Sequence, residues 1–301
     1  MLQGTFGYVP ARPRRWETPP MPEPVVPAAR TIAEFEVERW HGGGLRQVRD
    51  QVAEELPVAL VYEDVPHGVM LATPADLEDF AVGFTLSEGL VERPEEIRGV
   101  EVRWSTEAAE ARVSVAWPRF TALLERRRRL TGRTGCGLCG VESPEAVLRP
   151  LKPVGSGGPR VSAASLHGAI GALADHQRLN ALTGSVHAAA WVRADGGIET
   201  LREDLGRHNA LDKLIGARVR AGADLAAGWV LLTSRASFEM VHKCATTGVT
   251  FVAALSAPTA LAVRLARESG VTLVAFARER QHVVYAHPER LLSESVDNPT
   301  L

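Results

Sequence analysis

The hydrophobic positions in the first half of the chain form short runs of strand length and two stretches with helical spacing. The clearer helical stretch is 74–90, where Leu77 and Phe84 lie on one apolar face. Thr73 stands where an N-cap belongs, and Pro74 occupies the first helical position, where a missing N–H is tolerated. The predicted elements are strands over 57–62, 69–72, 100–104 and 111–117, and helices over 74–90 and 120–130.

The second half of the chain is more regular. Three apolar strands alternate with two helices through short links, which implies parallel strands and right-handed crossovers. The predicted helices cover 162–182, 206–220, 237–247 and 258–269, and the predicted strands cover 188–192, 229–233, 250–255 and 271–277. The fold class is therefore α/β, with parallel strand–helix–strand units in the C-terminal part and a smaller N-terminal α+β lobe.

Two stretches show no regular pattern. Residues 1–28 are rich in proline and poor in residues that a core buries, so they predict a disordered or extended tail. Residues 131–160 are rich in glycine and proline, and loops of that length are usually functional or disordered. The chain thus divides into the tail, an N-terminal lobe over 29–130, a mobile loop over 131–160 and a C-terminal α/β lobe over 161–301.

Composition and charge narrow the class of protein. The 301 residues are 45% hydrophobic with a net charge of -2, which is typical of a globular chain and gives no overall attraction to nucleic acid or membranes. No run approaches the ~18 consecutive apolar residues that a membrane helix needs. Arg14 and Arg15 resemble part of a twin-arginine export signal, but the proline-rich residues after them lack its apolar region. We expect a cytoplasmic protein.

The most reactive side chains are Cys136 and Cys139, in the sequence Gly-Cys-Gly-Leu-Cys-Gly at 135–140. Glycines beside each cysteine leave the sulfur unhindered. A free thiol, with a pKa of about 8.5, is only slightly ionised at neutral pH, and Arg133 could favour the thiolate. The chain has three cysteines, too few for a disulfide framework of the secreted kind. We interpret the pair as a site of reactive-sulfur chemistry.

Two other interpretations of this pair stay open. A structural zinc site needs about four ligands, but the chain has no second C-x-x-C and no histidine follows the pair before His167. A thioredoxin-type redox pair lies at a helix start after a strand, whereas this pair lies in a glycine-rich stretch. We therefore predict no zinc. Cys244 lies among apolar residues of the helix over 237–247 and is expected to be buried.

Two histidines are candidates for a site. His187 follows Thr-Gly-Ser-Val and enters the strand over 188–192, where it either faces a cleft or makes a structural hydrogen bond. His208 belongs to Glu-Asp-Leu-Gly-Arg-His-Asn-Ala-Leu-Asp-Lys at 203–213, where Asp212 is its neighbour at helical spacing. So many polar types on one turn indicate a functional surface, although a helix start held by salt bridges would also account for them.

Polar residues follow each of the three parallel strands. In open α/β sheets ligands bind outside the carboxyl ends of the strands, and helix N-termini at that edge favour anions. The residues are Ser234, Arg235 and Ser237 after the first strand, Ser256 after the second, and Arg278 and Arg280 after the third. This arrangement predicts a phosphate or pyrophosphate site, and well-capped helices with exposed arginines are the alternative. The chain has no P-loop, so ordinary ATP use is not predicted.

A series of short motifs extends through nearly the whole chain beyond the tail. In order they are Leu-Pro-Val-Ala-Leu-Val-Tyr at 56–62, Asp-Leu-Glu-Asp-Phe-Ala-Val-Gly-Phe at 76–84, Ser-Glu-Gly at 87–89, the cysteine motif at 135–140, Thr-Gly-Ser-Val-His at 183–187, the stretch 203–213, Ser-Phe-Glu-Met-Val at 237–241, Ser-Ala-Pro-Thr at 256–259, and Phe-Ala-Arg at 276–278 with Tyr285 and Pro-Glu-Arg at 288–290. As an ordered set they closely resemble the FdhD family, the sulfur carriers that assist formate dehydrogenase maturation.

The resemblance implies a deaminase-like core without the zinc chemistry of deaminases. It implies that a cysteine desulfurase loads Cys136 with a persulfide, while Cys139 assists or resolves. The sulfur then passes to the molybdenum (or tungsten) bis-molybdopterin guanine dinucleotide cofactor before its insertion into formate dehydrogenase. A homodimer is a further implication of the resemblance alone.

The resemblance also places cofactor contacts at the end of the last parallel strand, where the residue pattern alone predicts an anion site. The predicted cofactor-binding residues are Phe276, Ala277, Arg278, Glu279, Arg280, Gln281, Ser234, Arg235, Ser237, Ser256, His187 and His208. The alternative function is a non-catalytic chaperone that binds the cofactor and has a structural or redox cysteine pair. A thiol–disulfide oxidoreductase ranks third.

Overall fold

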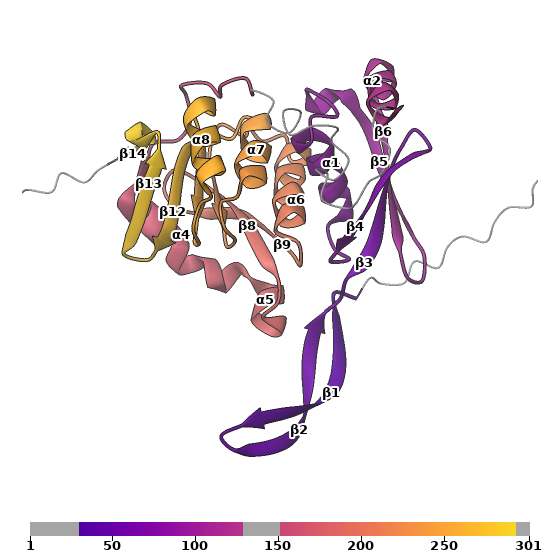
Figure 1. Cartoon of the computed structure of the whole chain (residues 1–301), viewed down its shortest axis with the longest axis vertical. Coiled ribbons are helices and arrows are strands. Elements are labelled where there is room, and N and C mark those ends of the chain that lie inside the picture. The colour runs from indigo at the N-terminus through magenta and orange to yellow at the C-terminus, as the bar shows by residue number, and fades with distance from the viewer. Residues whose placement is uncertain (1–29, 129–150, 293–301) are drawn as a thin grey trace, which may run out of the picture.

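The computed structural model describes residues 30–128 and 151–292 (Figure 1). The predicted tail and most of the predicted loop, including Cys136 and Cys139, lie outside the described residues. Within the described ranges, no helix combines the length and the apolar character that crossing a membrane requires. The described chain forms two packed lobes and a hairpin that projects from them (Figure 1).

The N-terminal lobe is a four-stranded sheet in the order β4-β3-β6-β5, with α1 packed on its buried face. The predicted strands and helices of this lobe are present. Their observed bounds are β3 (Leu56–Tyr62), β4 (Val65–Ala72), α1 (Leu77–Ser87), β5 (Ile97–Trp104), β6 (Ala109–Val115) and α2 (Trp117–Arg128). β3 pairs with β4 antiparallel and with β6 parallel. Leu60, Tyr62 and Phe80 are fully buried at the centre of this lobe.

The predicted start of α1 is wrong. The helix begins at Leu77, after Asp76 in a left-handed conformation with φ of 54°, and Thr73 does not cap it. Thr73 is instead buried between the lobes, where its backbone N–H donates to Asp204 at 3.0 Å and its carbonyl accepts from Lys213 at 2.9 Å. These contacts come from residues about 130 positions away in sequence, so local capping rules could not anticipate them.

The C-terminal lobe is built on a six-stranded sheet in the order β13-β12-β11-β10-β8-β9. Its centre confirms the prediction, because β10 (Trp229–Leu232), β11 (Phe251–Ala254) and β12 (Thr272–Arg278) are parallel. α7 (Phe238–Thr246) and α8 (Ala260–Ser269) connect them. The sheet is mixed, because β8 (His187–Val192), β9 (Ile198–Asp204) and β13 (Gln281–Ala286) are antiparallel to their neighbours. Neither β9 nor β13 was predicted.

Helices cover both faces of this sheet. α6 (Arg207–Arg220), α7 and α8 pack on one face, and α4 (Ala163–His176) packs on the other (Figure 1). The helix predicted over 162–182 is in fact α4 followed by α5 (Arg178–Thr183), because Gln177 leaves the helical conformation with ψ of 74°. The Glu203 carboxylate accepts from the N–H groups of Leu179 and Asn180, both at 2.8 Å, and so caps the new helix. Cys244, in α7, is fully buried as predicted.

The two lobes meet where α1 crosses α6 at very short range. A Cβ added to Gly83 would lie 1.7 Å from the carbonyl oxygen of Asp212, and one added to Gly216 would lie 1.8 Å from that of Asp79. Two buried ion pairs flank this crossing. Lys213 contacts Asp204 at 2.6 Å, and Lys243 contacts Asp212 at 2.9 Å. Both pairs lie within the C-terminal lobe, but their members also bond across the junction: Lys213 donates to the Thr73 carbonyl at 2.9 Å, and Asp212 accepts from the Ser87 hydroxyl at 2.6 Å. Asp212 and Lys213 therefore hold the lobes together, which is the structural interpretation of the stretch 203–213.

A long hairpin precedes the N-terminal lobe, and the sequence pattern had predicted no element there. β1 (Ile32–His41) and β2 (Gly44–Ala53) form a two-stranded antiparallel sheet of their own. Gly42 and Gly43 connect them with φ of 58° and 83°, the positive values that a two-residue hairpin turn requires. Two further short strands, β7 (Val161–Ser162) and β14 (Leu291–Leu292), pair in parallel beside the C-terminal lobe.

Candidate functional site

The carboxyl ends of β10, β11 and β12 lie side by side at one edge of the sheet, the lower edge in Figure 1. Backbone contacts join the segments that follow them. The Ala236 N–H donates to the Ala257 carbonyl at 3.2 Å, and the Phe276 N–H donates to the Ser256 carbonyl at 3.2 Å. The structure thus brings together the three segments that the sequence placed after parallel strands. We call these segments, with the starts of α6 and α7, the strand-end edge.

His187 reaches the same edge because β8 is antiparallel to β10. It is the first residue of β8, and the next residue, Ala188, exchanges hydrogen bonds with Thr233 at the end of β10. His187 is partly buried. Burial, followed by the positive charge of Arg207, lowers its pKa below the ordinary value. His187 is therefore neutral at pH 7.

His208 and Arg207 begin α6 at this edge. Burial, with Arg207 and Lys243 adding to it, lowers the pKa of His208 to about 4. Across from them, burial alone would raise the pKa of Glu239, but hydrogen bonds at the start of α7 and electrostatic interaction with His208 and Arg207 lower it. A neutral imidazole and a guanidinium thus face one carboxylate across the starts of two helices.

Two nitrogen atoms of this cluster lack partners. Among the described residues, Arg207 Nε and His208 Nε2 are buried without a hydrogen-bond partner. Leaving a buried polar atom unpaired costs about 1–3 kcal/mol, so a ligand that forms hydrogen bonds with these nitrogens would recover that free energy. Arg207 and Glu239 were not predicted as site residues, although Arg207 lies beside His208 in the stretch 203–213. Its sequence position was the signal that could have found it.

The helix starts at this edge differ in how they are capped. Thr259 caps α8, because its hydroxyl accepts from the Ala262 N–H at 3.2 Å. Ser237 precedes α7 but makes no capping hydrogen bond with its side chain, and Gly206 precedes α6 without a side chain that could cap it. The N–H groups that begin α6 and α7, with their positive dipole ends, suit an anionic ligand.

The end of β12 contributes the most exposed of the predicted residues. Phe276 has a left-handed φ of 49° and 42% of its surface is exposed, which is unusual for a bulky aromatic residue in a strand. Arg278 is exposed, and its guanidinium donates to the carbonyls of Leu255 and Ala277. Glu279, Arg280 and Gln281 form the exposed turn into β13, while Ala277 is buried. This turn is the outer side of the strand-end edge.

The remaining predicted residues fall into two groups. Arg235 is exposed at the start of the β10–α7 link, whereas Ser234 and Ser237 are buried and Ser256 is partly buried. Cys136 and Cys139 lie outside the described residues, so their relation to this edge stays a prediction. At the start of the second described range, Leu151 and Val154 pack on the core of the C-terminal lobe. The Val154 N–H donates to the carbonyl oxygen of Ser269, the last residue of α8. That is the opposite edge of the sheet from the strand ends.

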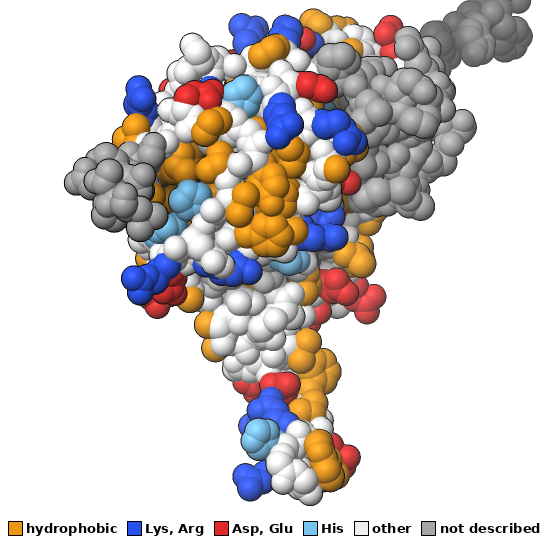
Figure 2. All heavy atoms as spheres, turned by 60° about the vertical axis from the view of Figure 1, so that its left-hand side comes forward, with side chains coloured by type: hydrophobic (Ala, Val, Ile, Leu, Met, Phe, Trp, Pro, Cys, Tyr) orange, Lys and Arg blue, Asp and Glu red, His pale blue; other side chains and the backbone are white. Residues whose placement is uncertain are grey.

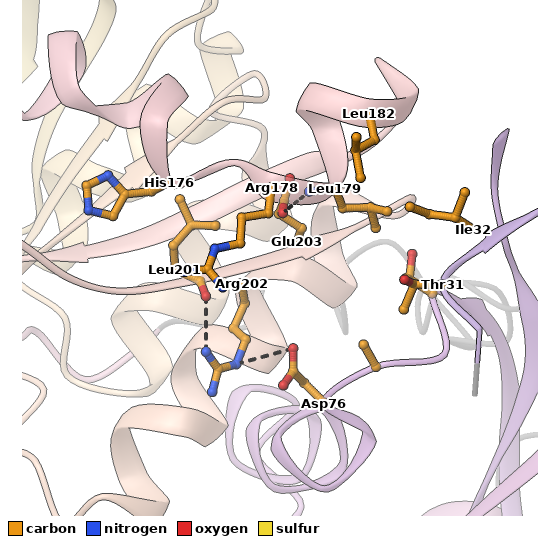
Figure 3. A pocket seen from close by; sticks show the side chains of 12 residues that line it. Thr31, Ile32, Asp76, His176, Arg178, Leu179, Leu182, Leu201, Arg202 and Glu203 are labelled. Atoms are coloured by element: carbon orange, nitrogen blue, oxygen red, sulfur yellow. Dashed lines mark hydrogen bonds and ion pairs between the residues drawn. The ribbon is translucent and has the colours of Figure 1, made fainter. Parts of the chain in front are cut away.

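A separate hollow of about 450 Å³ lies at the root of the hairpin, between β9, α5 and the start of α1 (Figure 3). None of the predicted site residues lines it. Its charged groups are largely paired: Arg202 contacts Asp79 at 2.7 Å and Asp76 at 3.5 Å, and Glu203 caps α5. The strand-end edge, with its unpaired nitrogens and its helix N-termini, is therefore the better candidate for an anionic ligand. Within the described residues, no three His, Cys, Asp or Glu side chains are grouped to hold a metal ion.

Comparison with known proteins agrees with the predicted family. A model of the FdhD/NarQ family matches residues 53–292. A protein of Cupriavidus necator named sulfur carrier protein FdhD is 52% identical over 270 residues, covering 88% of this chain and 92% of its own. A protein of the same name from Bordetella petrii is 48% identical over 267 residues, 88% of this chain and 96% of its own. The chain belongs to the FdhD/NarQ family.

A solved structure shows the same fold. A Desulfotalea psychrophila protein described as a formate dehydrogenase accessory protein superposes with a TM-score of 0.68 at 25% identity. The match covers 87% of this chain and all of that one. The α/β fold class predicted from sequence is thus confirmed, and this formate dehydrogenase accessory protein shares it.

Proposed function

We propose that this chain accepts a sulfane sulfur from a cysteine desulfurase and transfers it to the molybdenum (or tungsten) bis-molybdopterin guanine dinucleotide cofactor of formate dehydrogenase. The names of the relatives, which are sulfur carriers, support the transfer of sulfur. The name of the similar D. psychrophila protein supports the link to formate dehydrogenase. The observation that supports cofactor binding is the strand-end edge, where Arg207 Nε and His208 Nε2 are buried without partners in the described chain.

Sulfur loading needs one thiolate. The Cys136 sulfur attacks the terminal sulfur of a cysteine persulfide on the desulfurase, the donor's S–S bond breaks, and the donor leaves as a thiolate. Cys136 then carries the persulfide. Attack of Cys139 on the inner sulfur forms a Cys136–Cys139 disulfide and releases hydrosulfide to the metal, and a thiol reductant later restores both thiols.

The strand-end edge would hold the phosphates of the acceptor. Arg207 and Arg235 supply positive charge, and the starts of α6 and α7 supply N–H groups. His187 and His208, both neutral at pH 7, can donate to or accept from a purine edge or a ribose hydroxyl. The exposed ring of Phe276 offers a stacking surface for a base.

Chain length allows the cysteines to serve a ligand at this edge. Fifteen residues separate Cys136 from Leu151, which limits their distance to about 50 Å. α8, which spans the sheet from the strand-end edge to the edge where Leu151 packs, has ten residues and a length of about 15 Å. The covalent connection therefore does not exclude transfer from Cys136 to either edge.

Mass spectrometry tests the sulfur step. After incubation with a cysteine desulfurase and cysteine, we expect a gain of ~32 Da on Cys136 that a reductant removes. Cys136→Ala should lose this gain, and Cys244→Ala is the control because Cys244 is buried. A wild-type protein that gains no sulfur would favour the alternative, a chaperone that only holds the cofactor. Formate dehydrogenase activity should likewise be absent in a host carrying Cys136→Ala.

Calorimetry with GDP, a fragment of the cofactor, tests the binding edge. We expect a dissociation constant in the micromolar to millimolar range, roughly -4 to -8 kcal/mol, because GDP makes only part of the contacts. Arg207→Gln and Arg278→Ala should weaken binding by about ten- to a hundredfold, and added salt should weaken it in all variants. Cys136→Ala should bind GDP as the wild type does. If both arginine variants bind GDP as tightly as the wild type does, the nucleotide binds elsewhere on the protein.

A further inference from the structure

A pair of histidines joins α4 to β13 (Figure 1). The Nε2 atom of His167 and the Nδ1 atom of His282 lie 2.9 Å apart, and the two ring centroids lie 5.1 Å apart. Both side chains are partly buried. Figure 2 turns this side of the molecule forward and shows histidine side chains at its surface beside apolar ones. Neither residue was predicted as part of the site, although His282 directly follows Gln281.

His282 lies opposite a β-bulge in β12. Two residues of β12, Phe276 and Ala277, lie opposite this single residue of β13 in the antiparallel ladder. Phe276 is the first residue of the bulge and has a left-handed φ of 49°, a conformation that glycine usually supplies at this position. A bulge bends its strand and changes the direction of its side chains, and bulges are common beside active sites for that reason. Here 42% of Phe276 is exposed at the strand-end edge.

The left-handed conformation of Phe276 has to be held by its surroundings. A bulky residue rarely adopts it, and such a conformation persists only where neighbouring contacts fix the backbone. On one side of β12, the carbonyl of Ser256 accepts from the Phe276 N–H at 3.2 Å. On the other side lies β13, an edge strand that no further strand of the described chain supports. The hydrogen bond from His282 to α4 supplies that support directly opposite the bulge.

α4 is a firm base for this contact. Leu166 of the helix is fully buried, in the same hydrophobic cluster as Ala277 of the bulge. Gly171 lies one helical turn after His167, and a Cβ added to Gly171 would lie 3.9 Å from Cγ of Glu279 in the turn. The bulge and the turn thus rest on one side of α4, and the histidine pair is the part of this contact that depends on protonation.

We propose that the His167–His282 pair is a proton-sensitive latch that holds the bulge of β12, and with it the ring of Phe276, in position to stack on the guanine base of the cofactor. His167 is then a positioning residue, which acts on the ligand through Phe276 and does not touch it. This latch rests on the proposed function, because it requires a nucleotide at the strand-end edge. When the latch opens, the bulge relaxes and the stacking surface is lost, while the phosphate contacts of Arg207 and of the helix starts remain.

Protonation of both rings opens the latch. In a hydrogen-bonded pair of imidazoles, one of the two facing nitrogens carries the proton and the other accepts it. Burial, followed by the interaction with His167, lowers the pKa of His282, so His282 is neutral at pH 7. When both rings are protonated, both facing nitrogens are donors and the two positive rings repel each other. The open latch therefore binds more protons than the closed one, and opening is favoured as pH falls from about 7 to 5, where histidines titrate.

The charged groups around the pair leave this control to the two histidines. In the turn, Glu279 and Arg280 are exposed to solvent, and Arg278 donates to backbone carbonyls. Along α4, the first charged side chain after His167 is Asp175, about two helical turns away. α8 packs on the other face of the sheet, and its charged residues are Arg264, Arg267 and Glu268.

Calorimetry with two probes tests the latch, because GDP contains the base and inorganic pyrophosphate does not. At pH 7.5, His167→Leu cannot bond to His282 and should weaken GDP binding about tenfold, within the range that stacking on a base contributes. Its affinity for pyrophosphate should be unchanged. In the Phe276→Ala background, adding His167→Leu should have no further effect on GDP, since the ring that the latch positions is gone. His176→Leu is the matched control: His176 also belongs to α4 but bonds to Ala172 of its own helix, so this variant should bind both probes as the wild type does.

His167→Gln separates the position of the side chain from its protonation. A glutamine amide donates to a neutral His282 and accepts from a charged one, and it does not titrate in this range. The variant should therefore bind GDP as the wild type does at pH 7.5. Between pH 7.5 and 5.5 the wild type should lose about five- to tenfold more affinity for GDP than the variant. His187 and His208 are common to both proteins, so their titration cancels in the difference.

Several outcomes would overturn the latch and leave the strand-end site intact. They are equal GDP affinity of the wild type and His167→Leu, an equal loss for pyrophosphate, and an effect of His167→Leu that persists in Phe276→Ala. Equal losses of the wild type and His167→Gln on acidification would overturn it as well, and this comparison decides if His167→Leu fails to fold. A wild type that binds neither probe would instead contradict the strand-end site itself, and the latch with it.

Discussion

The junction between the lobes and the strand-end edge both contain buried polar atoms of ionisable side chains, and α6 contributes to both. At the junction, Lys213 and Asp212 have ion-pair partners at 2.6 and 2.9 Å. At the strand-end edge, one turn earlier in the same helix, Arg207 Nε and His208 Nε2 are buried without partners in the described chain. Paired buried charges hold the structure together, whereas buried polar nitrogens without a partner carry a cost that a ligand can remove. The contrast separates structural from functional residues within one polar stretch.

The largest effect should come from removing one partner at the junction. Lys213→Met leaves the Asp204 carboxylate buried and uncompensated, because both side chains are fully buried. We expect a loss of about 3–5 kcal/mol in the free energy of unfolding, as for other broken buried pairs. Urea denaturation followed by circular dichroism measures it. A loss no larger than that of breaking an exposed pair, as in Arg39→Met on the β1–β2 hairpin, would show that the buried pairs do not hold the junction together.

A nearly equal effect should follow from adding a single methyl group at the crossing of α1 and α6. In Gly83→Ala the new Cβ would lie 1.7 Å from the Asp212 carbonyl oxygen, so the two helices must move apart. We expect destabilisation by about 3 kcal/mol. Gly168→Ala in α4 is the matched control, because nothing lies within 4 Å of its added Cβ and it should gain about 0.5–1 kcal/mol. If both substitutions shift the denaturation midpoint in the same direction, the close packing of α1 against α6 at Gly83 is contradicted.

An intermediate effect should appear as a pH dependence that originates at the strand-end edge. The pKa of His208 is about 4 in the folded protein and lies near 6.5 in the unfolded chain. The unfolded chain therefore binds a proton first as pH falls, and the stability that His208 contributes is complete above pH 6.5 and is lost between about 6.5 and 4. Burial raises the pKa of Asp212 to about 6, which acts in the opposite direction in every variant that keeps Asp212, so the His208 contribution is measured as a difference. We expect the wild type to lose about 1–3 kcal/mol more than His208→Gln over this range. In His208→Gln the dependence over the same range should be weaker, and identical profiles would show that His208 does not titrate in this way.

The smallest effect on stability should come from Arg207→Gln. Its Nε is buried without a partner in the described chain, so truncation removes a cost as well as contacts. We expect the free energy of unfolding to change by less than about 0.5 kcal/mol, although the same variant should bind GDP much more weakly. A loss comparable to that of Lys213→Met would show that Arg207 is a structural residue, and the contrast within α6 would then disappear. Thermal unfolding with and without GDP measures both quantities on one sample.

Much of the fold could be predicted because the relevant patterns are local. The three parallel strands are continuous apolar runs, and the helices between them carry regular apolar faces, so both were found within a few residues of their observed bounds. Parallel strands must then share one carboxyl edge, which is why the segments after 233, 255 and 277 were expected to meet. The ordered motifs likewise sufficed to identify the family, and the family match over residues 53–292 confirms it.

Other features depended on residues that are distant in sequence. Thr73 was expected to cap α1 but contacts Asp204 and Lys213 instead, and the helix over 162–182 breaks where Glu203 caps α5. β9 and β13 are the two edge strands of their sheet, each paired with a single neighbour, and the β1–β2 hairpin has a glycine turn but no single apolar run. The ion-pair partners of Asp212 and Lys213 come from α7 and β9, and whether Arg207 Nε finds a partner likewise depends on what packs beside the start of α6. The chain by itself determined the parallel strands, the order of its motifs and its family, because those follow from local periodicity and residue identity. Only the tertiary structure decided which buried charges found a partner, because pairing requires side chains from different elements to come within a few ångströms.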